Sequence, residues 1–215
     1  RDGGQLRNGQ KGLTRMNDGL LCVSIRADTA DEMIAQIERS VPLADVVEVR
    51  FDNLDASAVS QISGLKFDIP LIATFRSDSK DARLAFWTDR HGAFWACDLE
   101  EDILASVECP RKIASFHDHS GVPTDMADIY DRLAASDADI IKIAVTANNI
   151  TDAIPVWKLI EAAQTAGKKV IPIAMGEAGK WTRILGLAHG AYLTYASFEA
   201  GTETADGQLT ASDMI

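Results

Sequence analysis

The sequence lacks any long apolar run, because no stretch approaches the roughly 18 consecutive apolar residues typical of a membrane-spanning helix. It also lacks a basic excess: 21 Lys and Arg stand against 32 Asp and Glu, which gives a formal net charge of −11. Nucleic acids and anionic membranes bind basic surfaces. These absences exclude a membrane span and argue against non-specific binding to nucleic acid or to a membrane.

Cysteine is scarce, and no secretory signal pattern is present. The three cysteines, Cys22, Cys97 and Cys109, are widely spaced in apolar contexts and match neither a metal-binding spacing nor a disulfide framework. We therefore expect buried thiols in a reducing compartment, no metal site, and a cytoplasmic location.

Extensive disorder is excluded as well, because 47% hydrophobic and 25% charged residues are ordinary values for a globular protein. Residues 1–16 differ from the rest, since they are rich in Gly, Gln, Asn and Arg and carry almost no periodic apolar signal. We interpret residues 1–16 as a flexible N-terminal extension or an expression-derived tail. Residues 17–215 are interpreted as one catalytic domain.

From Gly19 onward, short apolar runs alternate with amphipathic stretches. Most of the runs are rich in Val and Ile, as buried parallel strands should be. These strand candidates are residues 20–25, 46–51, 69–75, 94–99, 112–116, 139–145, 169–175 and 190–196. Helical apolar stripes lie at residues 29–40, 124–135, 153–166 and 179–188.

The alternation of strands and helices indicates right-handed βαβ units and a parallel sheet. Eight such units favour an α/β fold of one compact domain, the (β/α)8 TIM barrel, over an open doubly wound sheet. A Rossmann fold is further disfavoured because no Gly-x-Gly-x-x-Gly motif follows the first strand. The third unit is the least regular, since residues 78–90 are short for a crossover helix.

Charged residues within buried strands single out candidate site residues. Lys142 is flanked by isoleucines, and loss of hydration at a barrel-facing position favours the neutral amine, which can attack a ketone and form a Schiff base. His117 lies at the carboxyl end of the preceding strand, where barrel active sites lie, and could move protons for that chemistry. A salt-bridged lysine and a loop histidine are the structural alternatives.

Arginines at strand ends indicate an anionic substrate. Glu48 and Arg50 share one face of the second strand, Arg76 ends the third, and Arg183 follows the seventh. Each arginine alone would be read as a surface salt bridge. Together, in an acidic protein, the three indicate a carboxylate-binding pocket, because guanidinium groups bind carboxylates through two parallel hydrogen bonds.

Six short motifs follow one another along the chain, mostly at strand ends. They are Glu48-x-Arg50-x-Asp52, Thr74-x-Arg76, Ser115-x-His117-Asp118, Lys142-Ile143-Ala144, Met175-Gly176-x-x-Gly179-x-x-x-Arg183 and Gly207-Gln208. With these motifs in this order, residues 20–209 resemble the type I 3-dehydroquinate dehydratases. The resemblance implies a shikimate-pathway lyase of aromatic amino acid biosynthesis, with 3-dehydroquinate as its small-molecule substrate and no metal or organic cofactor.

The resemblance also implies a role for each candidate residue. Lys142 would form an imine with the C3 ketone, and His117 would remove the C2 proton and assist loss of the C1 hydroxyl. Arg183 would hold the substrate carboxylate, and Gln208 would close over the ligand. The further substrate-binding residues would be Glu48, Arg50, Arg76, Thr204, Met175 and Tyr195.

Two segments depart from the family pattern. Residues 80–82 read Lys-Asp-Ala where a Glu-Gly-Gly stretch is usual, so the glutamate that would position the histidine is absent unless Asp78 or Asp81 replaces it. Residues 204–208 read Thr-Ala-Asp-Gly-Gln in place of Ser-Ala-Pro-Gly-Gln, and loss of the proline predicts a more mobile loop. Neither change removes the lysine or the histidine, so we expect activity to be retained, at a full or reduced level.

Two rival functions stay open. A class I aldolase also uses a strand lysine on a TIM barrel, and a degenerate barrel could bind a shikimate-like ligand without catalysis. Relatives of the suggested family are often homodimers, and some are fused to shikimate dehydrogenase. Because the chain stops at Ile215, before a helix that would complete the eighth unit, we keep a longer fused parent chain as an expectation.

Overall fold

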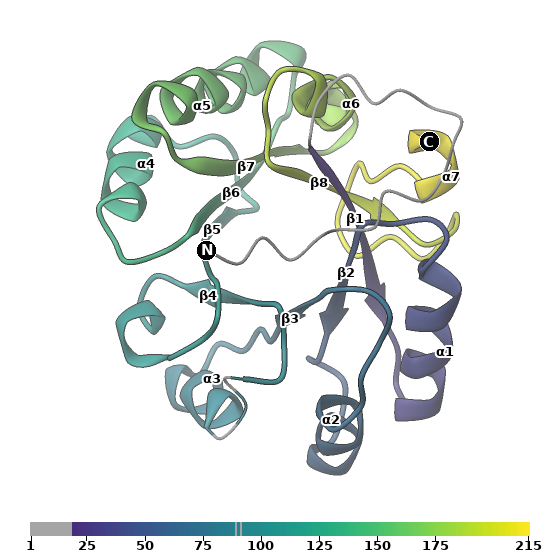
Figure 1. The fold of residues 1–215 in the computed structure, drawn as a ribbon. Helices are drawn as coiled ribbons and strands as arrows, with labels where there is room; N and C mark the ends of the chain where they lie inside the picture. The colour runs from purple at the N-terminus through teal and green to yellow at the C-terminus, as the bar shows by residue number, and fades with distance from the viewer. Residues whose placement is uncertain (1–18, 89, 91) are drawn as a thin grey trace.

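The computed structural model describes residues 19–88, 90 and 92–215, and the interpretation of residues 1–16 lies outside them. Eight parallel strands form the wall of a nearly closed barrel in one domain, surrounded by helices (Figure 1). This confirms the (β/α)8 prediction. The strands are β1 (Leu20–Arg26), β2 (Val46–Arg50), β3 (Leu71–Thr74), β4 (Ala96–Glu100), β5 (Lys112–Asp118), β6 (Ile140–Thr146), β7 (Lys169–Met175) and β8 (Leu193–Ser197).

The helices follow the predicted order with three additions. They are α1 (Ala30–Ser40), α2 (Ala56–Ser63), α3 (Lys80–Trp87), α4 (Met126–Ala134), α5 (Ala153–Ala166), α6 (Lys180–Ala188) and α7 (Ala211–Met214), with 3-10 turns η1 (Leu104–Ser106), η2 (Ile150–Asp152) and η3 (Glu177–Gly179). A helix of four residues, α7, follows β8, where the chain was expected to stop before any helix. The sequence did not predict α2 either, and it predicted only an irregular segment for α3. Both short helices begin at a side-chain cap, Asp55 for α2 and Ser79 for α3.

The register of the strands decides which side chains share the barrel interior. Neighbouring strands run β7-β6-β5-β4-β3-β2-β1-β8. Lys142 pairs with Ser115 across β5 and β6, so both point inward at one level, and His117 lies two residues nearer the carboxyl end of β5. At the seam between β7 and β8, Tyr192 N donates a hydrogen bond of 2.9 Å to Val170 O.

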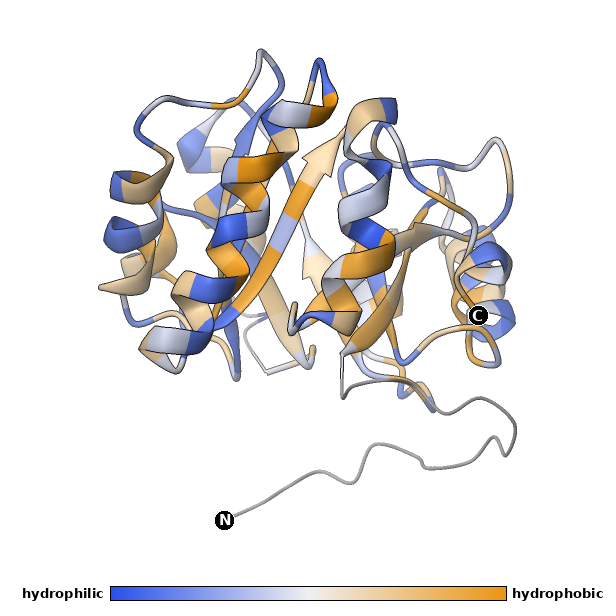
Figure 2. Ribbon diagram, turned by 90° about the horizontal axis from the view of Figure 1, so that it is seen from above, coloured by the Kyte–Doolittle hydropathy of each residue, from blue (hydrophilic) through white to orange (hydrophobic). Residues whose placement is uncertain are grey.

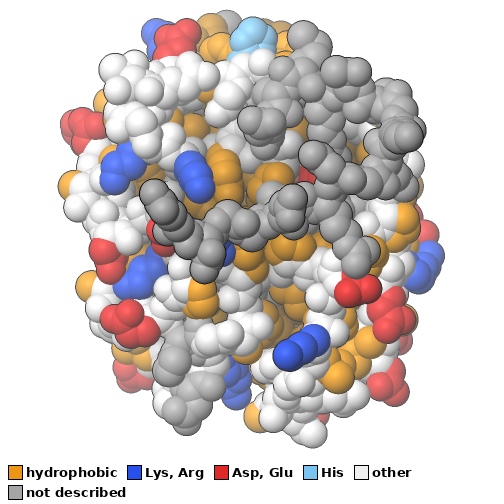
Figure 3. Space-filling model, viewed as in Figure 1, with side chains coloured by type: hydrophobic (Ala, Val, Ile, Leu, Met, Phe, Trp, Pro, Cys, Tyr) orange, Lys and Arg blue, Asp and Glu red, His pale blue; other side chains and the backbone are white. Residues whose placement is uncertain are grey.

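Apolar side chains fill both the barrel floor and the space between strands and helices. The floor cluster includes Cys22, Ile72, Ile113 and Ile140, all fully buried. A second, larger cluster joins the outer strand faces to the helices. Figure 2 shows the same division, with apolar residues on the strands and on the inner helix faces and polar residues outside. Figure 3 shows that charged side chains lie mainly around the edge of one end of the molecule.

None of the described helices is long and apolar enough to cross a membrane.

The expectation of three free thiols is wrong for two of the cysteines. Cys97 on β4 and Cys109 before β5 form a disulfide with a sequence separation of 12, while Cys22 remains a buried free thiol. Spacing could not reveal this pair, because β4 and β5 bring the two residues together only in the folded barrel. The crosslink closes the segment that carries the acidic carboxyl end of β4.

Reduction of the Cys97–Cys109 disulfide should lower thermal stability. Closing a loop of this length restricts the unfolded chain by about 3 kcal/mol, so a reductant should lower the melting temperature by several degrees. Calorimetry with and without a phosphine reductant measures this, and mass spectrometry should show a gain of two hydrogens. The double variant Cys97→Ala, Cys109→Ala should no longer respond to reductant. An unchanged mass after full reduction would contradict the crosslink.

Candidate active site

A cavity of about 620 Å³ opens toward the carboxyl ends of the strands. All ten residues predicted from the sequence line it: Glu48, Arg50, Arg76, His117, Lys142, Met175, Arg183, Tyr195, Thr204 and Gln208. They come from β2, β5, β6, β7, β8, α6 and the segments that follow β3 and β8. The structure thus gathers into one site residues that are spread over most of the sequence.

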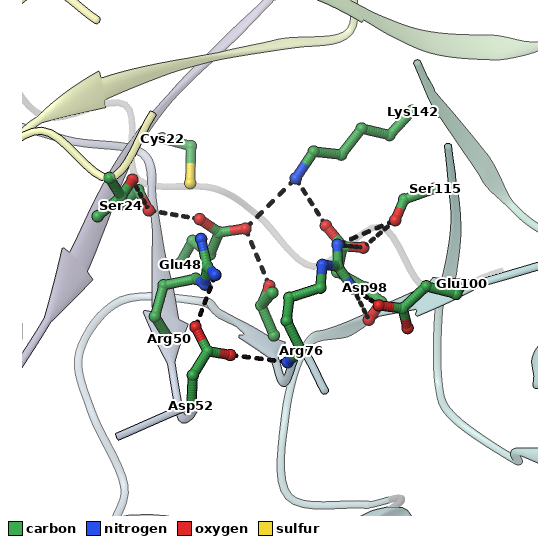
Figure 4. A network of polar contacts seen from close by, with 12 residues as sticks. Cys22, Ser24, Glu48, Arg50, Asp52, Arg76, Asp98, Glu100, Ser115 and Lys142 are labelled. Atoms are coloured by element: carbon green, nitrogen blue, oxygen red, sulfur yellow. Dashed lines mark hydrogen bonds and ion pairs between the residues drawn. The ribbon is translucent and has the colours of Figure 1, made fainter. Parts of the chain in front are cut away.

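Lys142 lies at the centre of this site. Its Nζ is 2.7 Å from Asp98 Oδ2 and 3.4 Å from Glu48 Oε1, and it lies over the Tyr195 ring at 4.3 Å from the centroid. Figure 4 shows the lysine reaching between the two carboxylates. Both carboxylates therefore lie close enough to Nζ to exchange a proton with it.

Asp98 is the main residue that the sequence reading missed. It is fully buried on β4, where Oδ1 accepts hydrogen bonds from Ser115 and from Arg76 Nη2 at 2.5 Å, while Oδ2 faces Lys142. Burial opposes its ionisation, but the charges of Arg76 and Lys142 lower the pKa of Asp98 far below its usual value. The rule that selected Lys142, a charge inside an apolar strand, would also have selected Asp98.

Glu48 is held by hydroxyl groups on both sides. Thr74 Oγ1 donates to its Oε1 at 2.9 Å, and Ser24 Oγ donates to its Oε2 (Figure 4). Burial acts to raise the pKa of Glu48, but the charges of Lys142 and Arg50 outweigh it and the net pKa lies below the usual value. Glu48 is therefore a fixed carboxylate beside the lysine.

His117 is half-buried at the cavity wall. Among the described residues, none forms a hydrogen bond with its ring. Burial, followed by the positive charges of Lys142 and Arg76, lowers the pKa of His117 well below 6.5. The imidazole is therefore neutral at pH 7 and able to accept a proton.

The three arginines have different roles in the structure. Arg50 donates to Asp52 at 2.6 Å, and Arg76 contacts both Asp98 and Glu100. Arg183 is only 1% exposed, and within the part of the chain that the structure describes its Nε and Nη1 have no hydrogen-bond partner. Burial lowers the pKa of Arg183 to about 10, which still leaves it charged at neutral pH. Arg183 is thus the arginine best placed to bind an added anion.

The segment after β8 is fixed beside Arg183. Arg183 Nη2 donates to Asp206 O at 3.1 Å, and Gly176 N donates to the same oxygen at 3.2 Å. Gly207 has a φ of +73° and packs so closely on Gly176 that a Cβ would collide with its backbone. Glycine is required there for the segment to reach the cavity.

Neither proposed substitute for the missing loop glutamate reaches the cavity. Asp78 and Asp81 are exposed and do not line it. The acidic residues that do line this side, Glu100, Glu101 and Asp102, come from the end of β4 and the residues after it. Arg83 on α3 pairs with Asp102 at 2.6 Å and so ties the segment after β3 to the end of β4.

The fold and the cavity together are typical of an enzyme on a (β/α)8 barrel, with a lysine, a histidine and a buried arginine at the carboxyl ends of the strands. The family model for type I 3-dehydroquinase matches residues 21–215. The chain belongs to this family, whose named members indicate a hydro-lyase.

Relatives agree over nearly the whole chain. The 3-dehydroquinate dehydratase of Desulfotalea psychrophila is 31% identical, over 93% of this chain and 96% of its own length. The bifunctional 3-dehydroquinate dehydratase/shikimate dehydrogenase of Arabidopsis thaliana is 27% identical, with 93% of this chain matching 36% of the longer protein. The type I enzyme from Clostridium difficile has the same fold, with a TM-score of 0.80 at 21% identity over 92% of this chain and 90% of that chain.

Asp98→Asn should strongly destabilise the protein, because it leaves Lys142 and Arg76 buried without their shared counter-charge. Loss of one partner from a buried ion pair costs about 3–5 kcal/mol, measurable as a lower urea midpoint. The matched variant Glu101→Gln removes an exposed partner of Arg132 and should leave the midpoint nearly unchanged. Equal shifts of the urea midpoint in the two variants would contradict a larger contribution of the buried ion pairs to stability.

Proposed function

We propose that this chain dehydrates 3-dehydroquinate to 3-dehydroshikimate in the shikimate pathway, through an imine on Lys142 with His117 moving the protons. The observation that carries this is the buried lysine, 6% exposed, at the wall of a cavity that also contains a neutral histidine. Family membership supports the reaction class, and the geometry supports the roles of the residues.

The first half of the reaction forms the imine. Lys142 gives its ammonium proton to a neighbouring carboxylate and attacks the C3 ketone, and water leaves as the iminium forms. The iminium withdraws electrons from C2 and acidifies its protons. Arg183, whose Nε and Nη1 have no partner among the described residues, would hold the substrate carboxylate by charge-assisted hydrogen bonds.

The second half removes water from the ring. His117 takes the C2 proton, which gives an enamine, and the enamine expels the C1 hydroxyl after the hydroxyl is protonated by His117 or a water that it holds. Hydrolysis of the product imine frees 3-dehydroshikimate and restores Lys142. Each proton that His117 takes is returned to the leaving group, so no cofactor enters the balance.

Sodium borohydride should trap the imine. Incubation with 3-dehydroquinate followed by reduction should leave a stable adduct on Lys142, located by mass spectrometry. Lys142→Ala should abolish the adduct, whereas His117→Ala should still form it while elimination slows by about 100-fold or more. Ligand binding without any adduct would favour the non-catalytic barrel, and turnover of an aldol substrate instead would favour the aldolase.

The pH dependence should follow the lowered pKa of His117. Only the neutral imidazole can accept the C2 proton, so kcat should be constant through neutral pH and should fall as the pH drops through that pKa, below pH 6.5. A stopped-flow or spectrophotometric pH series measures this. An acid limb centred above pH 6.5 would show that another group, or an unburied histidine, limits the rate.

A homodimer and a cytoplasmic location stay predictions, and fusion to a shikimate dehydrogenase is a property of the Arabidopsis relative.

A further inference from the structure

A chain of hydrogen bonds joins the segment after β8 to the catalytic lysine. Gln208 Nε2 donates to Thr204 Oγ1 at 3.1 Å, Thr204 Oγ1 donates to Ser24 Oγ at 2.7 Å, and Ser24 Oγ donates to Glu48 Oε2. The other oxygen of Glu48 lies 3.4 Å from Lys142 Nζ. Figure 4 shows the last part of this chain, from Ser24 through Glu48 to Lys142.

The direction of the chain is fixed by its carboxylate end. An ionised carboxylate can only accept, so the single hydroxyl proton of Ser24 points at Glu48. In the contact between the two hydroxyls Thr204 is then the donor, and at 2.7 Å this bond is shorter than its alternative to Gln208 Oε1 at 3.4 Å; Thr204 Oγ1 in turn accepts from the Gln208 amide. All the donors therefore point toward Glu48, and bonds aligned in this way polarise one another.

Burial makes this chain sensitive to change. Ser24 is 1% exposed, Glu48 3% and Gln208 7%, so water cannot readily replace a lost bond. Burial acts to raise the pKa of Glu48, and the hydrogen bond from Ser24 is one of the interactions that lower it. The Ser24 hydroxyl contacts two residues that line the cavity, Thr204 on one side and Glu48 on the other.

We propose that Ser24 is a positioning residue that couples the segment 204–208 to Lys142 through Glu48. The proposal rests on the proposed function, in which Lys142 must lose a proton before it attacks the ketone. When a ligand takes up the polar groups of Thr204 or Gln208, the donor to Ser24 is withdrawn and Glu48 becomes a better proton acceptor. The proton then moves from Lys142 Nζ to Glu48 Oε1, and the amine lone pair is freed as the ligand arrives.

The test isolates the imine step. In a His117→Ala background elimination is slow, so the rate at which sodium cyanoborohydride, which survives in acid, traps the adduct on Lys142 reports imine formation. Without the Ser24 hydroxyl, Glu48 is protonated at a higher pH and can no longer accept the lysine proton there. Ser24→Ala should therefore move the acid midpoint of the trapping rate upward by about half to one pH unit, and Ser24→Thr should restore it.

Two further variants separate coupling from general damage to the loop. Thr204→Val breaks the chain of hydrogen bonds one step before Ser24. The double variant with Ser24→Ala should therefore show the same shift of the acid midpoint as Ser24→Ala alone. Thr202→Ala alters the same loop at an exposed site whose hydroxyl, among the described residues, bonds only to Glu199, and it should cause no shift. The proposal is overturned if Ser24→Ala leaves the midpoint in place, if the Ser24 and Thr204 effects add, or if Thr202→Ala shifts it equally.

A measurement without substrate distinguishes this proposal from the proposed function. The Thr204 amide donates to Gln208 Oε1 at 2.8 Å, and its hydrogen exchange should be several-fold faster in Ser24→Ala than in the unaltered protein. If no adduct forms on Lys142 in the unaltered chain, the proposed function fails whatever this exchange shows. If the adduct forms and the Thr204 exchange is unchanged, only the coupling fails.

Discussion

The ion pairs of Lys142 with Asp98 and Glu48 are the constraint around which the interior is arranged. Burying one cation and two carboxylates is expensive unless each is paired and hydrogen-bonded, and here Arg76, Ser115, Thr74 and Ser24 complete the set. The members come from β1 to β6 or the residues that follow them. A shift of one residue in any of these strands would turn its polar side chain out of the barrel, so the cluster and the register require each other.

The barrel interior has two layers, an apolar layer that stabilises the fold and a charged layer that forms the candidate active site. The floor holds Ile72, Ile113 and Ile140 and is closed by apolar packing, whereas the charged layer lies above it toward the carboxyl ends. The dry floor lowers the local dielectric and so strengthens the ion pairs above it. Burial also keeps His117 neutral. It disfavours the charged imidazolium, and the positive charges of Lys142 and Arg76 nearby act in the same direction.

The strands could be predicted well from the sequence, because continuous runs of Val and Ile are typical of strands that are buried on both faces. The sequence did not predict α2, since residues 56–63 bury only Val59 and Ile62 and give a weak stripe. Lys142 and Glu48 stood out as charges in apolar strands, and Asp98 could have been found by the same rule. The Cys97–Cys109 disulfide and the Ser24–Thr204 bond could not, because they depend on how distant segments meet, in the latter case 180 residues apart.

The seam between β7 and β8 gives the site an uneven mechanical support. Every other neighbouring pair of strands in the described barrel forms a regular ladder, whereas β7 and β8 are not paired as strands. Arg183 follows β7 and Gln208 follows β8, so two residues that line the cavity are attached to opposite edges of this seam. The hydrogen bonds of Arg183 and Gly176 to Asp206 O join these two edges at the mouth of the barrel, so loop contacts there take the place of the missing ladder, while Lys142 and its carboxylates lie on the continuous wall.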